Sequence, residues 1–476
     1  MNGTSGKAGS GSGGGGSSSV GGAGGEGGAG GMSGDCDTTK SPTEEACLVA
    51  DEYAVFVSPD GDDDKNDGSQ GSPLASLTKA VEIAEGTKLV LVCDATYDEH
   101  VVVGAAAHVY GGFRCTDWAA EIGKPLFKPT TAGPALKIDS VDDEVLIQAV
   151  SFEVGDPLGA GETALAAIVN ASPKVTLRGV SLKAGKGKAG THGSLTPFNA
   201  PDASTLNGNP ESAQTPGTGG GEKICQCQTP LTSIGGVGGT PSSTGQSGAK
   251  GGPSHGPAGG EGGDPAAGDC GNGSSGKKGA NAAATAPASG ASALGIAAVT
   301  GWQPTPGSDG ATGQPGQGGG GGASLNASGH GGGGGCGGCG GNGGTAGKGG
   351  GGSIALLALA SPVMLEASTL VTADAGNGGA GAAGQVAKTD IGAGGSVVSS
   401  INSCPGGNGG KGGDGGAGGG GAGGISVGVV WKGAMQPTVS PDTMIMNGKA
   451  GSKGAGGVPG TNDGIAGVAQ KSLSLN

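Results

Sequence analysis

The ten cysteines of this 476-residue sequence are the residues with the clearest capacity for chemistry. Two of them form a C-x-x-C motif, Cys336-Gly-Gly-Cys339, inside a long glycine tract. A structural zinc site needs four ligands, usually from two such pairs, and the further candidates are His330, Cys270 and Cys404. These residues are too scattered to complete a site. We therefore predict no metal ligands and favour disulfides that staple the loops.

Carboxylates are the second group that could act chemically. The pair Asp142-Asp143 and the triplet Gly329-His330-Gly331 match two motifs of polygalacturonase-like enzymes, but no R-x-K motif accompanies them. Glycoside hydrolysis needs two carboxylates at a fixed separation, and a histidine inside a glycine tract does not help to fix one. A lyase would need a basic residue with calcium carboxylates nearby, and Arg178 has neither a second arginine nor an acidic ladder around it. We predict no catalytic residues.

Five aspartates lie close together in one polar turn: Asp60, Asp62, Asp63, Asp64 and Asp67. An EF-hand frame that starts at Asp60 fails, because Lys65 stands where glycine is needed and Gly71 where glutamate is needed. A looser calcium site and a solvated turn both remain open, and we favour the turn. A near-match to a phosphate-binding loop around Lys277 has Lys278 in place of serine or threonine and no preceding strand, so we predict no bound cofactor.

Composition limits what this chain can be. It holds 118 glycines and 26 prolines with only 2% aromatic residues, which excludes one ordinary large globular core. The net charge of −14 makes nucleic acid an unsuitable partner. Arg114 and Arg178 are the only arginines, so the chain has few side chains suited to binding acidic sugars or nucleotides. No apolar run is long enough to span a membrane.

The start of the sequence and its cysteines indicate different compartments. The first residues lack the apolar segment of a secretory leader, whereas an even number of cysteines suits an oxidising compartment. We reconcile the two by expecting a leader upstream of Met1, an extracellular or cell-surface location, and outer-membrane anchorage through that leader. A cytoplasmic protein with free thiols is the alternative.

Residues 53–128 have the pattern of conventional protein. "YAVFVS" predicts a strand, and Ser72 with Pro73 predicts the start of a helix that carries "LASLTKAVEIAEG". "KLVLVC", "HVVVG" and "HVYGGF" predict further strands. This segment is expected to form an N-terminal strand–helix cap.

After the cap, a pattern of core-facing positions, φ-x-φ-x-x-φ-x-φ, occurs four times, each copy preceded by a short apolar run. The four copies are Val145, Ile147, Val150 and Phe152; Val175, Leu177, Val180 and Leu182; Val363, Leu365, Ser368 and Leu370; and Val439, Pro441, Met444 and Met446. Each copy describes two strands with an extra residue where the chain bends. Because one unit cannot bury its own apolar side, stacked units are expected.

We therefore predict an all-β fold: a right-handed parallel β-helix, or solenoid, with long glycine-rich loop insertions that all leave from one corner of the coil. The domain boundaries follow from composition. They are a flexible Gly/Ser-rich tether at 1–52, the cap and first strands at 53–128, rungs at 129–183, a glycine-rich insertion at 184–352, a rung at 353–375, a second insertion at 376–422, and the last rung with a glycine-rich tail at 423–476.

Two disulfides are predicted within this arrangement. Cys93 and Cys115 both border strands of the cap region, and about one coil separates them, which would bring them within the Cα distance of a disulfide. Cys36 with Cys47 is the second pair. The other six cysteines have no assigned partners: Cys225, Cys227, Cys270, Cys336, Cys339 and Cys404.

The chain resembles bacterial glycine-rich exported surface proteins of the PGRS type that carry a pectate-lyase-like β-helix domain of unassigned function. The resemblance rests on "FVSPDGDDDKNDGSQGSPLASLTKAVEIA", "LVLVCDATYDEHVVV", "VYGGFRCTDW" and the units that end in "GGISVGVVWKG". It implies a capped β-helix with glycine-rich loops, and export.

We expect a non-catalytic surface or matrix protein whose scaffold displays glycine-rich loops to cell-surface polysaccharide or other envelope components. The alternative is a β-helix that binds or cleaves carbohydrate. The sequence leaves the oligomeric state open. If the tracts are insertions, removing residues 187–350 should leave the rungs folded, whereas removing 353–371 should not.

Overall fold

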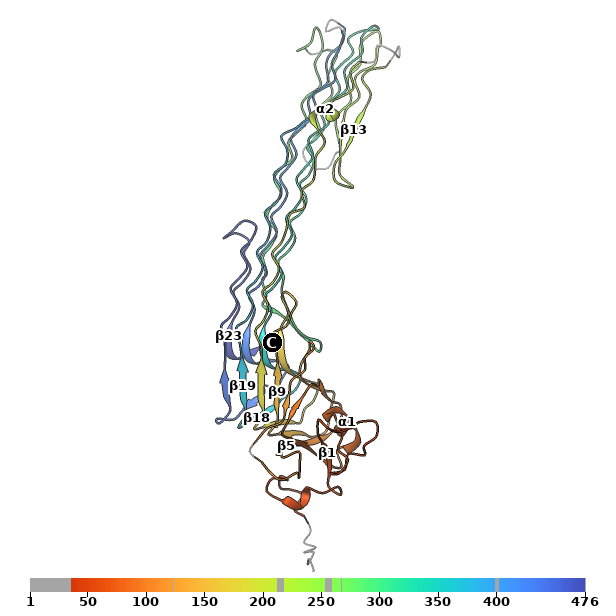
Figure 1. Ribbon diagram of the computed structural model, residues 1–476. Helices are drawn as coiled ribbons and strands as arrows, with labels where there is room; N and C mark the ends of the chain where they lie inside the picture. Colours follow the sequence, from red (N-terminus) through yellow and green to blue (C-terminus); the bar gives the residue numbers. More distant parts are fainter. Residues whose placement is uncertain are drawn as a thin grey trace, which may run out of the picture.

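A β-rich body and a long, narrow bundle of extended chains make up the molecule (Figure 1). The computed structural model describes residues 36–121, 123–211, 218–252, 259–266, 268–398 and 402–475. We call the three parallel sheets and their cap the body, and the projecting bundle the stalk. The part of the predicted tether up to residue 35 lies outside the described residues.

Three parallel sheets form the body, each with its strands hydrogen-bonded in the following order. The first sheet contains β1 (Ala54–Val57), β2 (Leu89–Cys93), β5 (Ala107–Phe113), β8 (Val145–Gln148), β11 (Val175–Arg178), β18 (Met364–Glu366) and β21 (Thr438–Val439). The second contains β23 (Ala469–Ser474), β20 (Ser426–Lys432), β17 (Ser353–Leu359), β10 (Ala164–Asn170), β7 (Leu136–Asp139) and β4 (Val101–Val103). The third contains β22 (Met444–Met446), β19 (Thr369–Thr372), β12 (Ser181–Ala184), β9 (Ser151–Val154), β6 (Leu126–Phe127) and β3 (Thr96–Tyr97).

The predicted repeats are the strand pairs that pass from the first sheet to the third. In the first copy, Val145, Ile147, Val150 and Phe152 are all fully buried. The apolar runs that precede the copies form β7, β10, β17 and β20 in the second sheet. The body is thus built of parallel sheets with very little helix, which is consistent with a β-helix.

The extra residue of each copy adopts the left-handed conformation that bends the chain between sheets. Ala149, Gly179 and Ala367 occupy this corner with φ of 57°, 59° and 45°. Ser368, the polar member of the third copy, is buried beside the corner. Its hydroxyl accepts from the Val180 amide at 3.1 Å and donates to the Leu177 carbonyl at 3.0 Å. A serine therefore replaces an apolar residue at this position because it satisfies backbone groups at the bend.

The fourth copy differs from its prediction. Val439 pairs with Leu365 and Ile445 pairs with Leu370, so Ile445, rather than Met444 or Met446, occupies the core-facing register position. Met444 and Met446 are 58% and 47% exposed. The reason is a longer turn between β21 and β22, in which the Ser440 and Asp442 side chains accept from the Ala367 amide.

The helix of the cap begins later than the sequence indicated. Helix α1 (Leu77–Ala84) has Ser76 as its N-cap, because Leu74 is still extended and bridges Val57. Two carboxylates accept hydrogen bonds from the free backbone amides at the start of the helix. Asp63 accepts from the Ser76 amide at 3.0 Å, and Glu99 accepts from the Leu77 and Thr78 amides at 2.9 Å each.

Part of the predicted tether has structure. Residues 36–52 include the short helix η1 (Ala46–Leu48), and Leu48 is fully buried.

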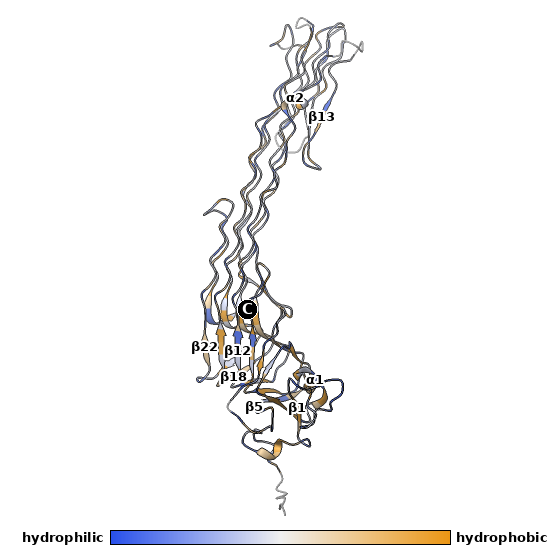
Figure 2. Ribbon diagram, in the orientation of Figure 1, coloured by the Kyte–Doolittle hydropathy of each residue, from blue (hydrophilic) through white to orange (hydrophobic). Residues whose placement is uncertain are grey.

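Strongly hydrophobic residues gather on the strands and cap of the body, whereas the stalk is near neutral in hydropathy (Figure 2).

Candidate functional site

The stalk consists of three excursions of the chain out of the body. The first leaves after β12 and returns at β17, the second spans residues 373–425 between β19 and β20, and the third is a short hairpin at 447–468 before β23. The first excursion also turns back near the body at the hairpin of β15 (Gly295–Ala298) and β16 (Gly301–Pro304). Its remaining elements are β13 (Lys223–Gln226), β14 (Thr232–Gly235) and α2 (Ala203–Leu206).

Backbone hydrogen bonds join the stalk chains at every third residue. The amides of Gly338, Gly341, Gly344 and Gly347 donate to the carbonyls of residues 410, 413, 416 and 419, at 2.9–3.1 Å. A period of three residues is that of the polyproline II helix, which makes no hydrogen bonds within itself. The glycine tracts are therefore a hydrogen-bonded bundle of extended chains, rather than loops that bury little.

Glycine leaves room at many of the points where two segments of the stalk pack most closely. A Cβ atom on Gly343 would lie 1.9 Å from the Gly310 carbonyl oxygen, and one on Gly344 would lie 2.2 Å from that of Ala382. The next residue, Thr345, is exposed and needs no such gap. The G-x-y triplets at 307–318 follow the same rule on a chain with fewer neighbours. They are too few for a collagen-like helix between chains, but they serve within this bundle.

Three disulfides link chains of the stalk, and they use all six of the unassigned cysteines. The pairs are Cys225–Cys336, Cys227–Cys339 and Cys270–Cys404, with Cα–Cα distances of 6.2, 5.4 and 5.6 Å. The C-x-x-C motif thus forms disulfides with two cysteines from an earlier segment of the same chain. The structure also contains the two pairs predicted from sequence, Cys93–Cys115 and Cys36–Cys47.

The acidic turn uses its carboxylates for local structure. Asp62 accepts from the amides of Asp64 and Lys65 and pairs with the Lys65 ammonium at 2.6 Å. Asp67 accepts from the Ser69 amide. The Lys65 hydrogen bond is the main cause of the lowered Asp62 pKa. Across the described ranges, no group of three or more His, Cys, Asp or Glu side chains is placed to hold a metal ion.

The remaining catalytic fragments are not brought together. Asp143 lies in the exposed turn before β8, where Lys174 is its ion-pair partner at 3.8 Å. The His330 amide, in the stalk, donates to Ser403. Arg178 pairs with Glu366 at 2.7 Å across the first sheet.

In the described part of the chain, no helix is long and apolar enough to cross a membrane.

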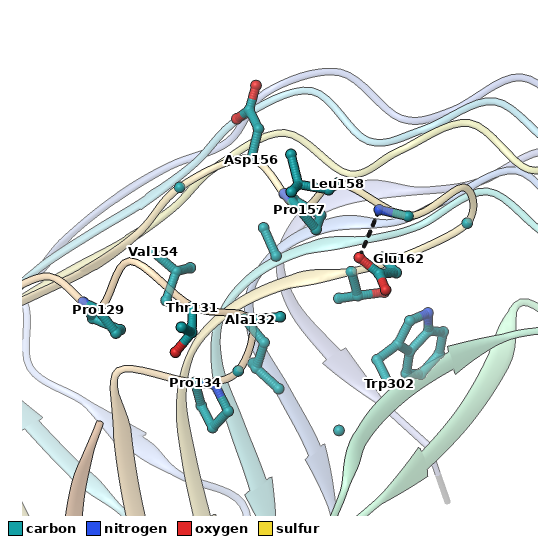
Figure 3. A pocket seen from close by; sticks show the side chains of 18 of the residues that line it. Pro129, Thr131, Ala132, Pro134, Val154, Asp156, Pro157, Leu158, Glu162 and Trp302 are labelled. Carbon is teal, nitrogen blue, oxygen red and sulfur yellow. Dashed lines mark hydrogen bonds between the residues drawn. The ribbon is translucent and has the colours of Figure 1, made fainter. Parts of the chain in front are cut away.

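A cavity of about 740 Å³ lies where the stalk meets the body. Its walls come from three parts of the chain: the loop 129–134, the segment 154–165, and residues 300–304 of the β15–β16 hairpin. Figure 3 shows Glu162 and Trp302 on one side of it and Pro129 on the opposite side. The cavity could not be identified from the sequence, because its walls are far apart in the chain.

The turn of the short hairpin allows a pH prediction. Asp463 accepts from the amides of Gly456 and Gly460 at 2.9 Å each and pairs with Lys453, and these bonds lower its pKa to about 2. The folded-state pKa lies below the ordinary value near 4. The stabilisation is therefore complete above about pH 4 and is lost as the pH falls through about 2. We expect the amide resonances of Gly456 and Gly460 to titrate with a midpoint near pH 2. Asp463→Asn should abolish that titration, and a midpoint near 4 would contradict the assignment.

A short part of the chain matches a known family. A family profile described as a protein of unknown function (DUF1565) covers residues 60–103, from the acidic turn to β4. That family is associated with parallel β-helix proteins. No curated protein and no solved structure matches the chain.

Proposed function

We propose that the protein is an exported, non-catalytic surface or matrix protein, in which a right-handed parallel β-helix presents a stiff glycine-rich stalk to envelope components. The observation that carries this proposal is the stalk itself. At a rise of about 3.1 Å per residue, the single chain 330–352 spans about 70 Å. Hydrogen bonds at every third residue, together with three disulfides, link the neighbouring segments of the stalk.

Two further observations support this function. Five disulfides are consistent with an extracellular protein, and the resemblance to PGRS-type exported proteins agrees with them. Several carboxylates of the body cap α1 or pair with lysine. Glu153, for example, bridges Lys128 and Lys183 at 2.9 and 3.1 Å. Burial raises the pKa of Glu153, but the hydrogen bonds from these two lysines outweigh it and lower the pKa.

Fractionation of cells that produce the full chain, followed by protease treatment of intact cells, tests the location. We expect the protein in the surface or medium fraction, cleaved by external protease, with thiols that resist alkylation until a reductant is added. Recovery in the cytosol with reactive thiols would refute export.

The absence of catalysis needs a separate test. Incubation with neutral and acidic polysaccharides, with and without calcium, should release no shorter products. Product release would establish the alternative, a polysaccharide-cleaving β-helix.

A further inference from the structure

The Cys36–Cys47 disulfide is more exposed than the other four. Cys47 is exposed and Cys36 is half-buried, so neither end of this disulfide lies in the interior. Each of the other disulfides contains at least one buried cysteine, and the three in the stalk contain two. Thiol–disulfide exchange requires that a thiolate reach one of the two sulfur atoms. A thiol in solution therefore reaches Cys36–Cys47 more readily than any other disulfide of this chain.

The loop that this disulfide closes is held together by its own contacts. Among the described residues, every hydrogen bond and ion pair that residues 37–47 make has its partner within residues 37–49. Attachment to the body begins directly after the loop, where Leu48 is fully buried and Asp51 accepts from the Gln70 amide at 2.6 Å. Opening the disulfide therefore breaks no hydrogen bond between the loop and the body.

The same loop is acidic around its sulfur atoms. It contains three carboxylates, from Asp37, Glu44 and Glu45, and a single lysine, Lys40. One carboxylate oxygen of Glu45 lies 3.4 Å from the Cys47 sulfur. The attacking group in exchange is an anionic thiolate, which these carboxylates repel. A thiol that carries a positive charge, or that has cationic groups around it, meets an attraction instead.

We propose that Cys36–Cys47 is an exchange site at which a thiol in positively charged surroundings becomes covalently attached to the protein. The thiolate attacks Sγ of Cys47 and forms a new S–S bond. The old S–S bond breaks, and its electron pair leaves on Sγ of Cys36, which takes up a proton from water. One disulfide replaces another, so the step needs neither an oxidant nor a reductant.

The place of the loop gives this exchange a consequence for the whole molecule. Figure 1 shows the first described residues at the end of the body that is remote from the stalk. A thiol attached to Cys47 would therefore hold the molecule at the end opposite the stalk. This inference goes beyond the proposed surface function, and it does not depend on what the stalk contacts.

Exchange in the folded, full-length chain tests the site. The probes are cysteamine, which is cationic, and 2-mercaptoethanesulfonate, which is anionic, compared at equal thiolate concentrations. Alkylation stops the exchange, and peptide mass spectrometry identifies the cysteines that have reacted. We expect Cys36–Cys47 to open at least about tenfold faster than any other disulfide, because access limits the others.

The charge of the thiol should set the rate at this site. At low salt we expect Cys36–Cys47 to react about fivefold faster with cysteamine than with the sulfonate. In 1 M salt, where the screening length is about 3 Å, the two rates should become nearly equal. A peptide with cysteine between arginines represents a protein thiol, and it should also form a mixed disulfide with Cys47. Reaction with cysteamine but not with this peptide would identify small thiols as the source.

Variants separate the charge effect from folding. Glu44→Gln combined with Glu45→Gln should make the rates with the two thiols nearly equal. The control, Glu82→Gln on the exposed side of α1, should leave their ratio unchanged. Cys36→Ser combined with Cys47→Ser should abolish the mixed disulfide and leave the melting temperature of the body unchanged.

Three results would overturn the proposal: another disulfide that opens as fast, equal rates with the two thiols at low salt, or a lower melting temperature in the double serine variant. None of them bears on whether the protein reaches the cell surface.

Discussion

Gly347→Val will open the stalk around residue 347, while Lys348→Val, one residue further on, will leave it intact. A Cβ atom on Gly347 would lie 1.8 Å from the Gly379 carbonyl oxygen, which is a backbone atom that cannot turn aside. Overpacking of this kind costs about 2–3 kcal/mol. The side chain of Lys348 is exposed, and a surface substitution there should change stability by less than about 0.5 kcal/mol.

Hydrogen exchange of the stalk amides measures this difference. We expect the amides of residues 344, 347 and 350 to exchange about 30- to 150-fold faster in Gly347→Val than in the parent, which is the same energy expressed as a ratio. The body amides should keep their protection, because the substitution lies outside the sheets. Equal protection in the two variants would mean that the chains are not packed as described.

Deletion of residues 353–371 will unfold the body, whereas deletion of 187–350 will not. The first deletion removes β17, β18 and most of β19, including Ile354, Leu356 and Leu357, which are fully buried. Each such side chain contributes about 1.5–3 kcal/mol, so losing one rung approaches the whole stability of a domain. The second deletion joins Lys186 to Gly351 and keeps β10 paired with β17.

The longer deletion nevertheless has a consequence that the sequence alone did not indicate. It removes the partners that residues 376–425 have in the first excursion, while those within the second excursion and in the hairpin at 447–468 remain, and it leaves Cys404 without Cys270. We expect circular dichroism melts to show the β signal of the body retained, and limited proteolysis to cut the remaining tract readily. Loss of the β signal in this variant, together with its survival in the 353–371 deletion, would make the glycine bundle the true core.

The repeated strand pairs could be predicted because each has a period of two with one bend. The core positions from Val145 to Leu182 follow directly from that pattern. The same pattern fails at Met444 and Met446. A longer turn shifts the register there by one residue. A one-residue shift exchanges the two faces of a strand. In the sequence, Ser368 resembles a weakened position of the repeat, because the sequence does not reveal the backbone groups to which its hydroxyl is hydrogen-bonded.

The glycine tracts and the cavity could not be predicted for a different reason. A period of three was visible in the triplets at 307–318, but a polyproline II chain has no hydrogen bonds of its own and gains them only from chains far away in sequence. The same distance hid the stalk disulfides, since Cys225 and Cys336 are 111 residues apart. Residues 300–304 join the walls of the cavity only because the β15–β16 hairpin returns to the body.

The antiparallel course of the stalk chains determines how the molecule carries force. Each excursion enters and leaves the body through strands of neighbouring rungs, so a pull on the far end loads both legs of a hairpin along their length. Because both legs are anchored in the body, they share the load along their covalent backbones, and the hydrogen bonds between the legs keep them aligned without carrying it. Disulfides between chains prevent one leg from sliding past the next. A load on the far end of the stalk would therefore pass into the ends of β12, β17, β19 and β20, which are interior strands of their sheets.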